Sequence, residues 1–419
     1  MTISKTSLNF INHFFSLVTD NMDILTKNTI NEILKKMHIK LSLSDKFYNL
    51  YQKQIKKESV VVNEKTYLSK QFKLIKNGNF IPSIIHKKIK KINFNEIYYF
   101  KIKNVEFQVH FVSIKKKSRN DLDKKIKKII KMIHFLLSFH VDLNVESINI
   151  LLFLTNEKKE LPVNSSVVLN EMNVNTAVTY SCSKNGEVFL YREEEYFKVL
   201  IHELLHSLCF DFSKLSISFD IKSIILKMFN VNSKFYIAEA YAEFWANIIN
   251  TSFVSYEYLK DKQDVDDFIY NFKILNLFEK FFSIFQCIKM LDFMGLTYLD
   301  VISKDKKTIN FSLSKYKENT NVFAYHILKM VWLFNTESFI NWFNKNNIHL
   351  IYSQKTTEYT KNILKKTKTH YNDEKLLELI KYIEIFYKNI KNINNINNNS
   401  EYESTKDLLK NARMCLLDI

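Results

Sequence analysis

The spacing of apolar positions changes along the first third of the chain, and the predicted secondary structure changes with it. Over residues 1–92 apolar side chains recur at helical spacing, which indicates helices joined by loops. Residues 97–102 and 105–111 lose this period and are predicted to be two strands with a tight connection. Residues 121–140 then carry isoleucines along one side of an amphipathic helix.

Three further strands and two further helices follow. Residues 148–154 form a short continuous apolar run, as expected for a buried strand. Residues 176–181 and 187–191 are typical of a hairpin. Residues 193–210 are predicted to be a helix with acidic residues in its first turn, where the helix dipole favours them. Residues 235–249 are predicted to be the next helix.

This order of elements predicts an α+β fold in three parts. Residues 1–92 form a helical N-terminal segment, residues 93–250 hold a mixed sheet with the two helices, and residues 251–419 form a helical C-terminal region. Only the Asn-rich residues 391–400 indicate a linker or low-complexity loop. With 419 residues, 46% of them hydrophobic, the chain can fill two or three packed cores, and global disorder is excluded.

The net charge of +17 has two interpretations. One is a nucleic-acid-binding protein. The other, which we favour, is an AT-rich genome such as that of a large DNA virus, because the lysines are spread along the whole chain. Specific nucleic-acid binding is therefore not expected. With three glycines and no GxxxxGK[ST], GxGxxG or GxSxG pattern, loops that cradle phosphates are nearly excluded.

The cysteines and the apolar segments predict an intracellular protein in the cytoplasm, in a host cell or virion if the source is viral. Cys182, Cys209, Cys287 and Cys415 stand apart with no CxxC pair, so reduced thiols are expected. Cys209 is interpreted as a small buried hydrophobic residue. The N-terminus lacks the pattern of a secretory signal, and no apolar run is long enough to span a membrane.

The sequence HELLH lies inside the predicted helix 193–210. His202 and His206 are four residues apart, so both imidazoles can reach one Zn²⁺ from the same helix face. Glu203 then lies beside the metal and can act as the general base toward water. This spacing predicts a mononuclear zinc site of the metalloprotease type.

A catalytic zinc needs a third protein ligand, and the helix 235–249 is the best source. Glu239 and Glu243 are four residues apart and share one face of this helix. We predict Glu239 as the ligand and Glu243 as the acid that accepts the ring N–H of a ligand histidine, although the reverse assignment stays open. An ordinary solvated helix face is the alternative, but the rest of this helix is apolar.

HELLH followed by a helix bearing ExxxE resembles the gluzincin branch of zinc metallopeptidases over about residues 93–250. The resemblance implies His202, His206 and Glu239 as zinc ligands, Glu203 as the base and Glu243 as an acid contacting the first histidine. The second motif reads AEAYAE rather than NExxSD, so no named peptidase family is assigned.

The same resemblance implies an edge strand and an oxyanion donor. Residues 176–180 or 187–191 would pair with extended substrate backbone, unless the hairpin merely caps the sheet. Tyr325 and His326 are candidate donors, with core packing on a helix as the favoured alternative.

The predicted function is zinc-dependent hydrolysis of peptide bonds in a peptide or protein substrate. One alternative is a zincin-like binding or structural protein that has lost catalysis. The other is a basic nucleic-acid-associated protein with an accidental HExxH, in which Glu239 would lie far from His202.

Overall fold

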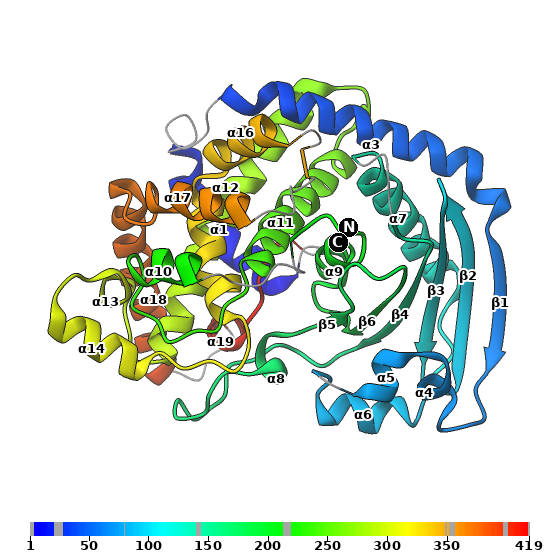
Figure 1. Ribbon diagram of the computed structural model, residues 1–419, viewed down its shortest axis with the longest axis horizontal. Helices are drawn as coiled ribbons and strands as arrows, with labels where there is room; N and C mark the ends of the chain where they lie inside the picture. Colours follow the sequence, from blue (N-terminus) through cyan, green and yellow to red (C-terminus); the bar gives the residue numbers. More distant parts are fainter. Residues whose placement is uncertain are drawn as a thin grey trace.

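The computed structural model has an α+β fold in which one mixed sheet packs against a helical region (Figure 1). It describes residues 4–20, 28–78, 80–139, 144–212, 219–347, 350–351, 357–396 and 401–417.

The strands are β1 (Lys56–Val61), β2 (Phe94–Ile102), β3 (Val105–Ser113), β4 (Ser147–Thr155), β5 (Ala177–Thr179) and β6 (Asn185–Arg192). The helices of the first half are α1 (Lys5–Asp20), η1 (Asn28–Ile30), α3 (Asn31–Tyr51), η2 (Gln52–Gln54), α4 (Tyr67–Gln71), α5 (Lys73–Asn77), α6 (Ser83–Ile89), α7 (Arg119–Leu137), α8 (Glu171–Val174) and α9 (Tyr196–Ser207). Those of the second half are α10 (Phe219–Leu226), α11 (Ile237–Glu257), α12 (Val265–Phe293), α13 (Tyr298–Ile302), α14 (Lys306–Lys315), the π-helix η3 (Phe323–Leu328), α15 (Lys329–Phe334), α16 (Thr336–Asn346), α17 (Thr357–Lys368), α18 (Glu374–Ile396) and α19 (Glu401–Lys410).

The strand order in the sheet is β1-β2-β3-β4-β6-β5. Strands β3, β4 and β6 are parallel, whereas β1, β2 and β5 pair antiparallel to their neighbours. Helix α7 makes the crossover between the parallel strands β3 and β4. The hairpin predicted from the sequence is β5–β6, and it places β5 at the edge of the sheet.

Strands β4 and β6 are buried on both faces, as the apolar sequence of β4 predicts. Ile150 and Val188 belong to the main core, which also contains side chains of α7, α9 and α11. Their neighbours Leu151 and Phe189 point to the opposite face, into a smaller core with α4, α5 and α6. Helix α9 lies between the sheet and α11, so the HELLH segment sits where sheet and helical region meet (Figure 1).

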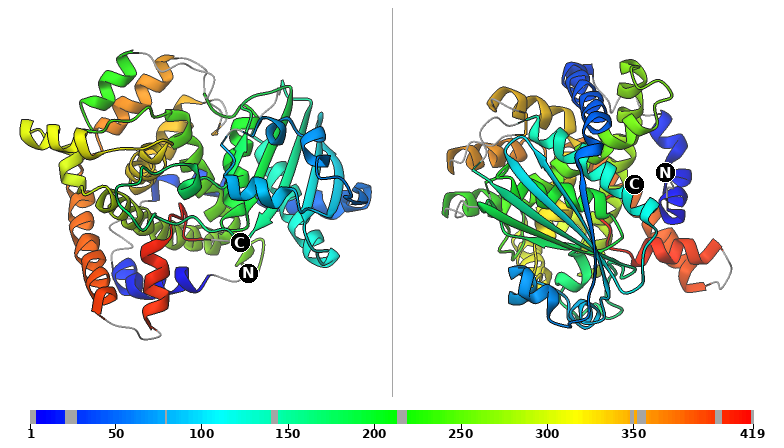
Figure 2. Two further views of the ribbon diagram at one scale, coloured as in Figure 1. Left: turned by 90° about the horizontal axis from the view of Figure 1, so that it is seen from below. Right: turned by 90° about the vertical axis from the view of Figure 1, so that its right-hand side faces the viewer.

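The second half is helical, as predicted, and Figure 2 shows it packed beside the sheet. After α19, residues 411–417 run through the interior. The backbone N–H of Ala412 donates to the carbonyl oxygen of Lys159 at 2.8 Å, and Leu416 and Leu417 are buried. No described helix combines the length and apolar character needed to cross a membrane.

Three details differ from the sequence-based expectation. Strand β1 lies within residues 1–92, where only helices and loops are predicted, and it extends the sheet at its far edge. Helix α9 begins at Tyr196, so the acidic residues 193–195 precede its first turn. Helix α18 continues to Ile396, so residues 391–396 of the predicted linker are helical, and residues 397–400 lie outside the described residues. His140, the last residue of the predicted helix 121–140, also lies outside them.

Candidate metal centre

Two packed helices supply the centre. Helix α9 carries His202, Glu203 and His206, and α11 carries Glu239 and Glu243. The helices can approach closely because the positions on either side of Glu239 and before Glu243 are buried alanines. Every residue of α9 is buried, so its two histidines and its glutamate must find partners within the protein.

The three predicted ligands meet at one point. Nε2 of His202 lies 3.0 Å from Nε2 of His206, and Oε2 of Glu239 lies 3.2 Å from the first nitrogen and 3.5 Å from the second. Metal–ligand bonds of about 2.0–2.1 Å at a tetrahedral angle separate ligand atoms by roughly 3.3 Å. The donor set and its spacing therefore fit one metal ion of this size. Within the described part of the chain, His202, His206 and Glu239 form the one cluster of histidine, cysteine or acidic side chains that could hold a metal ion.

A carboxylate faces the outer nitrogen of each histidine. Oε1 of Glu243 lies 3.2 Å from Nδ1 of His202, a close contact without hydrogen-bond geometry, and Asp211 bonds to Nδ1 of His206. With the Nδ1–H of His206 directed at Asp211, the lone pair of its Nε2 is directed into the triangle of donor atoms. The ring of His206 is thus held in an orientation that suits metal binding.

The electrostatics of the cluster favour positive charge. Burial alone would lower the pKa of His206, but the carboxylates of Asp211 and Glu239 outweigh it and raise that pKa well above the usual value. Burial would raise the pKa of Glu239, yet His206 and His202 hold it far below the usual value. The surplus of buried carboxylates stabilises the extra protons on the imidazoles. It would equally stabilise a divalent cation that replaces those protons.

Glu203 lies next to the triangle and lines a small cavity. Burial raises the pKa of its carboxyl, and the neighbouring histidines oppose this shift. The cavity measures about 30 Å³, which is room for one or two water molecules. It is lined by Lys159, Val174, Asn175, Thr176, Ala177, Val199, His202, Glu203, Glu243, Tyr325 and Met414.

The structure separates the two candidate oxyanion donors. The hydroxyl of Tyr325 donates to Oε2 of Glu239 at 3.0 Å, and its ring lines the cavity. His326 is buried, does not line that cavity, and neither ring nitrogen has a hydrogen-bond partner among the described residues. Adjacent residues on a helical turn point in different directions, so only one of the pair faces the centre.

Two contributing residues were missed in the sequence. Lys198 forms a buried ion pair with Glu243 and lies four residues before His202 on the same helix. A lysine within an apolar helix that carries the two candidate ligand histidines was the available signal. Asp211 lies in the loop after α9, and its position five residues after His206 follows no helical spacing that would single it out.

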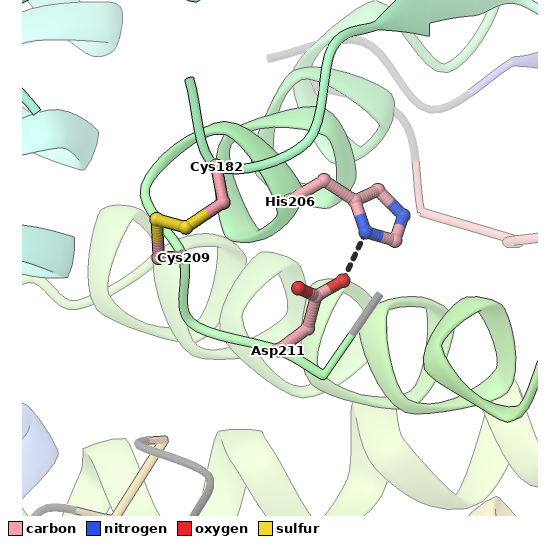
Figure 3. The surroundings of a disulfide bond; sticks show 4 residues. All are labelled: Cys182, His206, Cys209 and Asp211. Carbon is pink, nitrogen blue, oxygen red and sulfur yellow. Dashed lines mark hydrogen bonds and ion pairs between the residues drawn. A yellow bond between two sulfur atoms is a disulfide. The ribbon is translucent and has the colours of Figure 1, made fainter. Parts of the chain in front are cut away.

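The expectation of reduced thiols is wrong for two cysteines. Cys182 and Cys209 form a disulfide across a separation of 27 residues, while Cys287 and Cys415 are free and buried. The pairing arises because the turn between β5 and β6 packs against the end of α9, a tertiary contact that cysteine spacing does not reveal. Cys209 is accordingly more than a small buried hydrophobic residue (Figure 3).

Comparisons with protein-family models, with curated proteins and with solved structures found no match to this chain.

Proposed function

We propose that the chain is a zinc-dependent peptidase in which His202, His206 and Glu239 hold one zinc ion. The observation that carries this proposal is the triangle of two imidazole nitrogens and one carboxylate oxygen, with separations of 3.0, 3.2 and 3.5 Å. Three protein ligands leave one tetrahedral position for water or substrate, which is the pattern of catalytic rather than structural zinc sites.

The bound metal would polarise the substrate carbonyl and lower the pKa of water to about 7. Glu203 takes a proton from the attacking water and later delivers it to the leaving amine. Its place in the water-sized cavity beside His202 and Tyr325 suits this role. Tyr325 donates its hydroxyl proton to Glu239 here, and the same hydroxyl can donate to a negative oxygen that develops on the substrate.

An extended peptide is the substrate class that the surrounding fold favours. Strand β5 is an edge strand whose first residue, Ala177, lines the cavity next to Glu203. A peptide added to that edge would run past the proposed zinc site with its backbone hydrogen-bonded to the strand.

A second candidate function is a metal-binding protein of the same architecture without peptidase activity. The size of the cavity favours this second candidate, because about 30 Å³ admits water but no peptide. Lys159 and Met414 are among the residues that line the cavity. Under the peptidase proposal, these segments must move to admit substrate. The nucleic-acid alternative requires Glu239 to be remote from His202, and the distance of 3.2 Å contradicts this.

Zinc content and activity of two proteins test the proposal. The wild type should bind one zinc per chain and cleave members of a broad peptide library. Glu203→Gln should bind the same amount of zinc, because Glu203 is not a ligand, and lose roughly 10²–10⁴-fold in rate. A wild type that binds zinc but cleaves nothing would favour the second candidate, and a wild type without zinc would refute both.

A further inference from the structure

The end of α9 is held in a conformation that its sequence does not favour. Cys209 has a φ of +62°, in the left-handed region, and its disulfide partner Cys182 has a φ of +52°. Glycine is the usual residue where a helix ends in this way. The backbone N–H of Phe210 donates to the carbonyl oxygen of Leu205 at 2.8 Å and closes the turn. A cross-linked cysteine thus takes the place of the usual glycine.

This turn places Asp211 against a metal-ligand candidate. Asp211 is two residues from Cys209, is 2% exposed, and bonds to Nδ1 of His206. On the other side of the disulfide, the backbone N–H of Cys182 donates to the carbonyl oxygen of His206 at 2.9 Å. Figure 3 shows the disulfide and the Asp211–His206 contact on the same turn.

We propose that Asp211 is a positioning residue for His206 and that the Cys182–Cys209 disulfide holds it in place, so that metal affinity depends on the redox state of this bond. The proposal rests on the proposed zinc site and extends it. Loss of the cross-link lets Cys209 leave the left-handed region, and the short connection carries Asp211 away from the ring. The neighbouring Phe210 and Phe212 are buried and keep the loop packed, so the effect is on geometry rather than on the fold.

The redox step is a two-electron thiol–disulfide exchange. A dithiol reductant attacks one sulfur of the Cys182–Cys209 bond, and a mixed disulfide forms as the other sulfur leaves as a thiolate and takes a proton. The second thiol of the reductant then resolves the mixed disulfide. Two protein thiols and one oxidised dithiol result. Cys182 is partly exposed, which gives a reductant a route to the bond.

Zinc affinity measured by competition with a chromophoric chelator tests the proposal. A trialkylphosphine serves as reductant, because it cleaves the disulfide with water and becomes the phosphine oxide without adding a thiol. The oxidised wild type should bind zinc about tenfold more tightly than the reduced wild type or Cys182→Ser/Cys209→Ser. The zinc affinity of Asp211→Asn should be lower by about 10–100-fold, and it should not change when the reductant is added.

A matched pair of variants tests the backbone argument. Cys182→Ser/Cys209→Gly lacks the disulfide but has a residue that adopts positive φ freely, so its affinity should return to within about threefold of the oxidised wild type. Ser207→Ala, on the same turn but with its hydroxyl bonded to Thr179 rather than to a histidine ring, should leave affinity unchanged. Circular dichroism checks that each variant folds. The visible spectrum of bound Co²⁺ should change in Asp211→Asn and stay the same in Ser207→Ala.

Equal zinc affinity in the oxidised and reduced wild type, or normal affinity of Asp211→Asn, would overturn the inference and leave the proposed function standing. Failure of Cys182→Ser/Cys209→Gly to recover would contradict the role of the turn. No zinc binding in either redox state would overturn both the inference and the proposed function.

Discussion

The hydroxyl of Tyr325 donates a hydrogen bond to Oε2 of Glu239, the same oxygen that lies 3.2 Å from Nε2 of His202. The π-helix η3 therefore delivers a donor to the proposed metal ligand from a segment 86 residues further along the chain. Short π-helical turns are frequent at functional sites.

Removing this hydroxyl should affect catalysis more than metal binding. Tyr325→Phe keeps the ring that lines the cavity, so we expect one zinc per chain and a peptidase rate lower by roughly 10²–10³-fold, the usual effect of losing one oxyanion donor. Zinc analysis and steady-state kinetics measure the two effects. Unchanged kcat would remove Tyr325 from the proposed mechanism.

Glu243 should control metal affinity without being a ligand. In Glu243→Gln the carboxylate facing Nδ1 of His202 is replaced by an amide, and zinc affinity should fall by about 10–100-fold while the stoichiometry stays at one. Glu257→Gln is the matched control, because Glu257 lies on the same helix, about 20 Å further along, and pairs with Lys131. A complete loss of zinc in Glu243→Gln would instead make Glu243 the ligand.

The buried pair of Lys198 and Glu243 predicts a coupled effect on stability. Lys198→Met leaves the Glu243 carboxylate buried without its ion-pair partner, and the free energy of unfolding should fall by about 3–5 kcal/mol. The double variant Lys198→Met/Glu243→Gln removes both charges, so it should lose less than the sum of the single variants in urea denaturation. Additive losses would show that the pair is not coupled.

Much of this site could be predicted from the sequence because its main elements are local. The spacing of His202 and His206 fixes their common face once the helix is assigned, and the same holds for Glu239 and Glu243. The sequence links helix α9 to helix α11 only through the need for a third ligand, and the structure places the two helices in contact.

The remainder depends on contacts between distant segments. Strand β1 has the polar sequence KKESVV and is mostly exposed, so no apolar pattern marks it; it forms by pairing with β2. The disulfide needs the β5–β6 turn beside α9, and Asp211 reaches His206 only through the turn at Cys209. Periodicity contains no information about such contacts.

Glu318 should make stability depend on pH. Burial raises the pKa of its carboxyl to about 7, although hydrogen bonds from Ser233, the N–H of Phe323 and Tyr316 oppose the shift. The folded state therefore binds the proton more tightly than the unfolded state, and the free energy of unfolding should fall, by on the order of 3 kcal/mol, as the pH rises from about 4.5 to 7. This carboxyl also anchors the start of η3, since it accepts from the backbone N–H of Phe323 at 2.7 Å.

Comparison with Glu318→Gln isolates this contribution, because the other titrating groups remain. Denaturation at several pH values should show a shallower decline for the variant between pH 4.5 and 7 and parallel curves above that range. Parallel curves throughout would mean that Glu318 titrates normally in the folded protein.

X-ray absorption at the zinc edge of the loaded wild type is the most direct measurement of the ligand set. The proposed site predicts one zinc with two imidazole nitrogens and oxygen neighbours at about 2.0–2.2 Å. A sulfur neighbour at about 2.3 Å, or a spectrum without imidazole scattering, would contradict a site built from His202, His206 and Glu239.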